Sequence, residues 1–80
     1  MRVISKESNR SSDEILDMAV EYFNGLFNLK VTEHVQGCCA EFSNEIGFVT
    51  IQIVPTSSLN EVVMTSTNWE YQIQDFIRSI

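Results

Sequence analysis

Apolar residues recur at helical spacing in two segments, one after the N-terminal stretch and one at the end of the chain. In the first segment they fall three and four residues apart, which predicts an amphipathic helix with one broad buried face. Ser11 and Glu14 form a capping-box pattern at its start, and Gly25 and Asn28 are stop signals at its end. The buried face is expected to carry Ile15, Ala19, Tyr22, Phe23 and Leu26.

The C-terminal segment predicts a second helix. Thr67 and Glu70 have the spacing of another capping box. Five apolar residues then share one face at helical spacing. They are Trp69, Ile73, Phe76, Ile77 and Ile80.

Four segments between the helices are rich in β-branched and aromatic residues, and turn residues bound most of them, which is typical of strands. They cover residues 29–35, 38–43, 48–54 and 61–67. Pro55 ends the third, because proline cannot donate a hydrogen bond to the next strand. Residues 1–10 are expected to form either a short extra strand or a loose arm.

The turns between the first three strands predict which residues share a face. With Gln36-Gly37 as a two-residue turn, His34 faces Cys39, and with residues 44–47 as a four-residue turn, Phe42 faces Val49. A slip of one residue would scatter the apolar set across both faces. Glu33 falls on the apolar face, so a bulge or a position at the sheet margin is expected there. That face carries Val31, Val35, Cys38, Ala40, Phe42, Val49, Ile51 and Ile53.

The element order α-β-β-β-β-α predicts an α+β domain, a two-layer α/β sandwich with a four-stranded, mainly antiparallel sheet and both helices on one face. The 80 residues are enough for a single domain, residues 1–80, and too few for two. The sequence leaves open the spatial order of the strands and the register of the fourth.

The chain is acidic, with a formal net charge of −6. Its five basic residues are scattered, which argues against nucleic acid and against an anionic membrane surface as partners. No apolar run is long enough to span a membrane, and the N-terminus lacks the apolar core of a signal peptide. Cys38 and Cys39 are adjacent and are expected to point to opposite faces of a strand as free thiols. These features predict a cytoplasmic protein.

His34, Cys39 and Glu41 form the sharpest candidate site. If His34 and Cys39 lie opposite each other, the imidazole lowers the pKa of the thiol and creates a nucleophile or redox sensor. With Glu41 diagonal to His34, the three side chains are also candidate ligands for a divalent metal. The alternative is a polar, solvated sheet face that carries no chemistry. No sequence motif implies a cofactor.

Phe48, Val54 and Val63 are candidates for an exposed apolar strip on the polar sheet face, provided that Val62 and Met64 point inward. The leading hypothesis is a small non-enzymatic interaction or regulatory module that uses its open sheet face or an edge strand. Its partner would be another protein or a second copy of the chain, as a homodimer. The alternative hypothesis is a thiol-dependent or metal-binding protein centred on His34, Cys39 and Glu41.

Overall fold

Five strands and two helices make up most of the chain in the computed structural model, which describes residues 1–80. The predicted two-layer α+β sandwich is confirmed, and the N-terminal segment is a full strand of the sheet. The strands are β1 (Arg2–Ser8), β2 (Lys30–Val35), β3 (Cys39–Ser43), β4 (Phe48–Pro55) and β5 (Asn60–Thr67). The helices are α1 (Ser12–Ala19), its π-helical continuation η1 (Val20–Leu26) and α2 (Glu70–Ser79).

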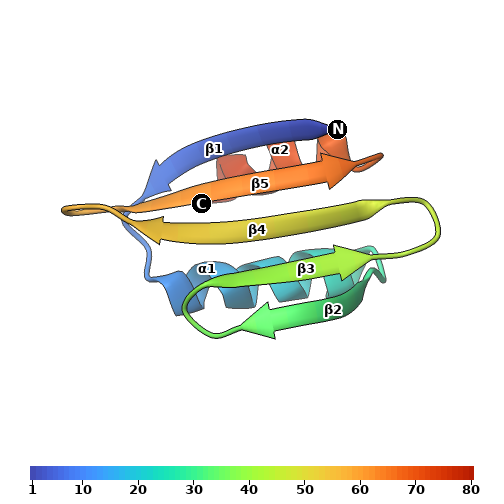
Figure 1. Ribbon diagram of the computed structural model, residues 1–80, viewed down its shortest axis with the longest axis horizontal. Coiled ribbons are helices and arrows are strands. Elements are labelled where there is room, and N and C mark those ends of the chain that lie inside the picture. Colours follow the sequence, from blue (N-terminus) through green and yellow to red (C-terminus); the bar gives the residue numbers. More distant parts are fainter.

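The sheet is entirely antiparallel, with the spatial order β1-β5-β4-β3-β2. The strands β2 to β5 follow one another as a meander, and β1 adds to the outer side of β5, so that β1 and β2 form the two edges. Figure 1 shows both helices behind the sheet, α1 behind β3 and β4, and α2 behind β1 and β5. The other face of the sheet carries no helix.

The hydrophobic core fills the space between the helices and the covered sheet face. Helices and strands contribute alternate or helically spaced side chains to it, as the apolar pattern predicts. Its buried residues are Ile15, Leu16, Ala19, Phe23, Leu29, Ala40, Phe42, Val49, Ile51, Ile53, Val62, Met64, Trp69, Ile73 and Phe76.

The two predicted helix starts have different outcomes. At α1 the Ser11 side chain accepts a hydrogen bond from the backbone N–H of Glu14 at 3.2 Å, as predicted. The predicted cap at Thr67 is wrong, because β5 continues through Thr67 and the chain turns only at Asn68, where φ is 68°. There the Glu70 carboxylate accepts a hydrogen bond from the Asn68 N–H at 2.9 Å.

The register of the central strands follows the prediction. Phe42 lies opposite Val49, and Ala40 lies opposite Ile51. In β5, Val62 and Met64 are buried and point toward the helices. The alternation of apolar and polar residues specifies these pairs, since any slip by one residue would expose the core side chains.

The predicted register of the β2–β3 hairpin is wrong by one residue. Gln36 and Gly37 do form a tight turn, in which the Cys38 N–H donates to the Val35 carbonyl and Gly37 has φ of 78°. A positive φ at this position is typical of a type II turn, which does not match the twist of a hairpin. Cys38 therefore remains an unpaired extra residue, and Val35 lies opposite Cys39.

A bulge between Val31 and Glu33 corrects this shift further along the hairpin. Beyond it Val31 lies opposite Phe42, as predicted. A bulge was expected at Glu33 and lies directly before it; the shift at the turn has already placed Glu33 on the open face, opposite Glu41. Between the turn and the bulge, the side chains of β2 therefore point to the opposite face from the one predicted. Val35, predicted to be buried, is 48% exposed on the open face.

Neither helix combines the length and the apolar character that a membrane-spanning segment requires.

Gly47 fixes the approach of the β3–β4 turn to the end of β5. A Cβ atom placed at Gly47 would lie 1.9 Å from the carbonyl oxygen of Thr67, so Gly47→Ala must displace backbone. We expect a loss of about 1–3 kcal/mol in the free energy of unfolding, measured by urea denaturation. Gly25→Ala is the matched control, because a Cβ there has no atom within 4 Å, and we expect a gain of about 0.5–1 kcal/mol. Equal stability of the two variants would contradict this account of Gly47.

Candidate functional site

His34, Cys39 and Glu41 are not brought together. The extra residue at Cys38 places His34 opposite Ala40, on the side of the sheet that the helices cover, whereas Cys39 and Glu41 point to the open face. Glu41 accepts a hydrogen bond from the Thr32 hydroxyl at 2.9 Å. No three His, Cys, Asp or Glu side chains are grouped so that they could hold a metal ion.

His34 instead borders a polar hollow at the N-terminal end of α1. The hollow has a volume of about 480 Å³. Asp13 and Asp17 line it from α1, together with Leu16, and Gln36 lines it from the β2–β3 turn. Two carboxylates thus line the hollow that His34 borders, and the Cys39 thiol points to the opposite face of the sheet.

The Cys39 thiol holds its proton more tightly than an ordinary cysteine. Its pKa is raised to about 11, first by the hydrogen bond with Cys38, then by burial and by negative charge at Cys38 and Glu33. The sequence hypothesis required a lowered pKa, which an imidazole next to the thiol would have produced. The structure places no imidazole beside Cys39.

The candidate strip of Phe48, Val54 and Val63 lies on the open face as predicted, but it is not continuous. Val54 lies opposite Glu61, and Val63 lies opposite Gln52, so the two valines are diagonal neighbours. Phe48 lies six residues from Val54 along β4, about 20 Å away. Between them β4 presents Thr50 and Gln52 to the open face, and Glu41 of β3 lies opposite Thr50. A role of this face in binding stays a prediction.

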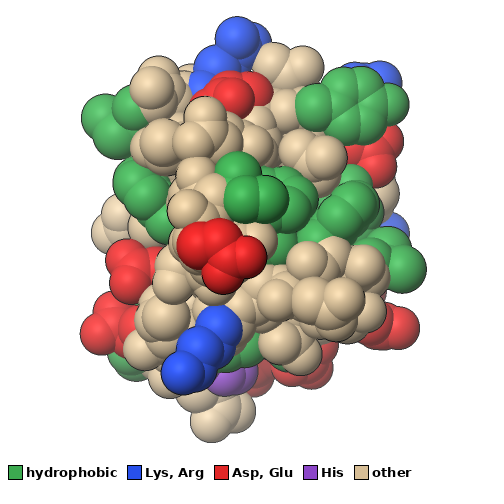
Figure 2. All heavy atoms as spheres, turned by 90° about the vertical axis from the view of Figure 1, so that its right-hand side faces the viewer, with side chains coloured by type: hydrophobic (Ala, Val, Ile, Leu, Met, Phe, Trp, Pro, Cys, Tyr) green, Lys and Arg blue, Asp and Glu red, His purple; other side chains and the backbone are tan.

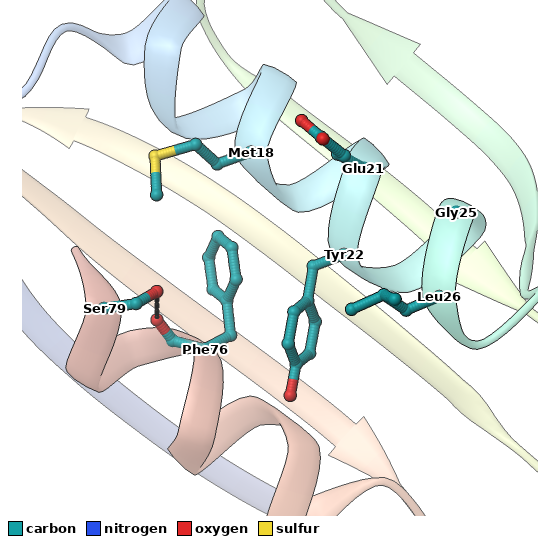
Figure 3. A pocket seen from close by; sticks show the side chains of 7 residues that line it. All are labelled: Met18, Glu21, Tyr22, Gly25, Leu26, Phe76 and Ser79. Atoms are coloured by element: carbon teal, nitrogen blue, oxygen red, sulfur yellow. Dashed lines mark hydrogen bonds between the residues drawn. The ribbon is translucent and has the colours of Figure 1, made fainter.

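A largely apolar groove lies between the two helices. It has a volume of about 510 Å³. Figure 3 shows the side chains that line it. Met18, Tyr22 and Leu26 project from α1 and η1 toward α2, and the Phe76 ring projects from α2 into the gap. Phe76 is 2% exposed and forms the floor, whereas Leu26 is 69% exposed and forms part of a wall. The remaining lining residues are Glu21, Gly25 and Ser79.

The π-helical segment explains why Leu26 lines this groove. Each residue of a π-helix turns the chain less than a residue of an α-helix, because its hydrogen bonds join residues five apart. After the buried Phe23, an α-helix would return Leu26 to the core, as the sequence predicts. In η1 the turn falls short, Leu26 stays exposed, and Phe27 packs at the core instead. Single π-helical turns occur frequently at functional sites.

Tyr22 joins the two helices at the groove. Its hydroxyl donates a hydrogen bond to Asp75 Oδ2 on α2 at 2.7 Å, and its ring packs edge-on against Phe23 and Phe27. The pKa of Tyr22 is raised well above its usual range, first by burial and then by the Asp75 carboxylate. The groove therefore has a rigid aromatic wall with one polar contact across it.

The exposed end of the groove continues onto an end of the molecule rich in apolar side chains. Figure 2 shows this end, where hydrophobic side chains gather in several places with acidic side chains among them. Leu26, Ile46 and Tyr71 are exposed by more than half of their surface. They come from the end of η1, the β3–β4 turn and the start of α2, which meet at this end (Figure 1).

Sequence reasoning missed the groove because it assumed regular α-helical periodicity. Met18 lies outside the predicted core stripe, and Leu26 was assigned to it. The available signal was Gly25, since glycine within a helix is unfavourable and its presence suggests a local irregularity. Comparison with models of known protein families and with curated proteins finds no match for this chain.

The Tyr22–Asp75 contact predicts a pH dependence of stability. Unfolded Tyr22 ionises near pH 10, while the folded protein keeps the proton to higher pH, so the free energy of unfolding falls as the pH rises above about 10. In Tyr22→Phe the part of this alkaline decline that comes from Tyr22 should be absent. At neutral pH the substitution should lower the free energy of unfolding by about 0.5 kcal/mol, because it removes one hydrogen bond. Urea denaturation at several pH values measures both effects.

Tyr71→Phe is the control for this experiment, because Tyr71 is 70% exposed. It should retain most of the pH dependence of the unmodified protein, because Tyr71 makes the smallest contribution to the raised pKa of Tyr22. If Tyr71→Phe and Tyr22→Phe change the alkaline decline equally, the Tyr22–Asp75 contact is not its cause.

Proposed function

We propose that this chain is a non-enzymatic protein-interaction module that binds an apolar helical segment of a partner in the groove between α1–η1 and α2. The observation that carries the proposal is the exposed Leu26 beside the buried floor of Phe76, in an open concavity of about 510 Å³. Concave apolar surfaces with a few polar groups are the usual form of binding sites.

The shape of the groove favours a helix as its occupant. Met18, Tyr22 and Leu26 follow one another at intervals of four residues, so they span about 12 Å along the helix axis. This length matches about two turns of a partner helix that presents apolar anchors three and four residues apart.

Charge favours a basic partner. Glu21 lines the groove, Asp75 holds Tyr22 at it, and the whole chain has a net charge of −6. Complementary charge raises the rate of association and suppresses wrong partners. The same negative charge supports the absence of nucleic acid among the partners. We further propose a cytoplasmic location, which the two free thiols support.

Nuclear magnetic resonance with a model peptide tests the groove. The probe is an amphipathic peptide of leucine and lysine with leucines three and four residues apart, titrated into ¹⁵N-labelled protein. Amide shifts should change along residues 18–26 and 76–79. Leu26→Glu should weaken binding about ten-fold or more, because it removes about 1.5–3 kcal/mol of apolar burial.

Ile46→Glu is the matched control, since Ile46 is 57% exposed in the β3–β4 turn and does not line the groove. It should bind the peptide as the unmodified protein does. Shifts confined to the open sheet face, or equal loss in both variants, would overturn the proposal. Binding of indole alone with no binding of the peptide would indicate a small apolar ligand in place of a partner helix.

Self-association through β1 is a second candidate function, and a specific observation favours it. Seven consecutive residues of β1 pair with β5 without interruption, and nothing pairs with its outer edge. The other edge strand, β2, is interrupted by the bulge between Val31 and Glu33. Bulges protect edges from pairing, whereas a regular edge accepts another strand.

Symmetry limits how two copies of β1 can pair. In a dimer joined through β1 the two sheets form one continuous sheet, and the open faces of both copies lie on the same side of it. Each residue of β1 must then pair with a residue of the second copy that points to the same face. Pairing about Ser5 uses all of Arg2–Ser8 and places Val3 opposite Glu7 of the second copy. Pairing about Ile4 or Lys6 brings basic side chains opposite each other, which is unfavourable.

A charge reversal tests this dimer. Val3 is 58% exposed, so Val3→Glu leaves the monomer intact but places glutamates opposite each other at two symmetric positions. Dimerisation, measured by analytical ultracentrifugation, should weaken about two- to thirty-fold. Adding Glu7→Lys should restore it through complementary pairs.

The control is Val54→Glu, on the open face of β4 and away from the edge. It separates the edge from the predicted contact patch of Phe48, Val54 and Val63. If Val54→Glu abolishes the dimer and Val3→Glu does not, the open sheet face is the interface. A monomer at every concentration removes self-association from the proposal and leaves the groove unaffected.

A further inference from the structure

The two cysteine sulfur atoms meet at the tip of the β2–β3 hairpin. The Sγ atoms of Cys38 and Cys39 lie 2.6 Å apart, and both residues are half-buried. In a regular strand adjacent side chains point to opposite faces, which is what the sequence predicts for this pair. Cys38 instead belongs to the turn as the unpaired extra residue, so the alternation is broken at that residue and the sulfurs converge.

We propose that Cys38 and Cys39 are a reversible oxidation site, at which the two thiols form a disulfide between adjacent residues of the folded chain. The inference is independent of the proposed binding function. It rests on the contact between the sulfur atoms and on the turn that produces it. The pair offers only two thiols, and no further metal-ligating side chain joins them, so oxidation is favoured over metal binding.

The electrons are taken by a disulfide such as oxidised glutathione. The thiolate of one cysteine attacks a glutathione sulfur, which breaks the glutathione disulfide, forms a mixed disulfide and releases one glutathione thiolate. The second cysteine loses its proton and attacks the protein sulfur of the mixed disulfide, which releases the second glutathione. Two electrons and two protons pass from the protein to glutathione, so one disulfide is exchanged for another.

The environment of the thiols gives them separate roles. The pKa of Cys39 is raised to about 11, first by its hydrogen bond with Cys38, so Cys39 suits the second attack, after that partner has reacted. Cys39 is then the resolving thiol. It loses the hydrogen-bond partner that raises its pKa once Cys38 is in the mixed disulfide. The reaction should therefore become faster as the pH rises.

Adjacency makes the bond readily reduced and gives it a local effect. Neighbouring Cα atoms lie about 3.8 Å apart, which is shorter than the separation in most disulfides, so the bond is strained and returns easily to thiols. The Cys38 carbonyl accepts a hydrogen bond from the Ile53 N–H at 2.7 Å, and Cys39 lies between Val35 and Gln52 on the open face. Oxidation would thus alter the turn and this part of the open face.

The experiment is equilibration of the full chain in glutathione buffers of defined ratio, followed by alkylation and intact-mass and fragment-ion mass spectrometry. As the share of oxidised glutathione rises, the chain should change from two alkylated cysteines to none, and its intact mass before alkylation should fall by two hydrogens. No attached glutathione and no cross-linked dimer should be found. Fragment ions should place the bond within the Cys38-Cys39 dipeptide. An amide spectrum recorded on the oxidised protein should retain the dispersion of a folded chain.

Cys38→Ser and Cys39→Ser are matched controls, and in oxidised glutathione each should carry one attached glutathione, because it has no second thiol to displace it. A chain that ends with glutathione on both cysteines would overturn the proposal, as would cross-linking between chains. Retention of both thiols in fully oxidised glutathione would also overturn it. So would a disulfide that forms only in denaturant, because the folded turn would then not bring the thiols together.

Discussion

The packing of both helices against one face of the sheet is the interaction on which the rest of this structure depends. A chain of 80 residues has apolar side chains for one core. The Phe23 ring lies within it, with its centroid 5.5 Å from the ring centroids of both Phe42 and Phe76. Once this face is covered, the opposite face has no helix to bury it. Its side chains are therefore mostly polar or small, apart from a few valines and Phe48.

The same packing creates the groove. Two helices that lie side by side on a sheet bury their inner faces and leave a furrow between their outer faces, and its depth depends on the side chains along the rims. Here the π-helical turn withdraws Leu26 from the core, and the Tyr22–Asp75 hydrogen bond ties the helices together across the furrow. A concave apolar surface arises without an internal cavity, which so small a core does not provide.

The two irregularities of the β2–β3 hairpin act as a pair. The extra residue at Cys38 shifts the register by one, and the bulge before Glu33 shifts it back, so the strand keeps Val31 at the core while its outer half changes face. This brings the two thiols together and separates His34 from Cys39. Both the loss of the predicted thiol–imidazole site and the gain of the adjacent dithiol follow from one inserted residue.

The sequence alone determined both helices, the strands β2 to β5, the two layers and the register of β3 against β4. These features depend on apolar periodicity, and a slip of Phe42 past Val49 would expose the core. The tertiary structure decided what periodicity does not encode: the pairing of β1 with β5, the turn conformation at Gly37 and the π-helical turn at Leu26. Turn type and helix winding decide which face of a strand or helix a side chain points to. Both can change while the apolar pattern of the sequence stays the same. The candidate sites depend on those directions, so they appeared only once the chain was folded.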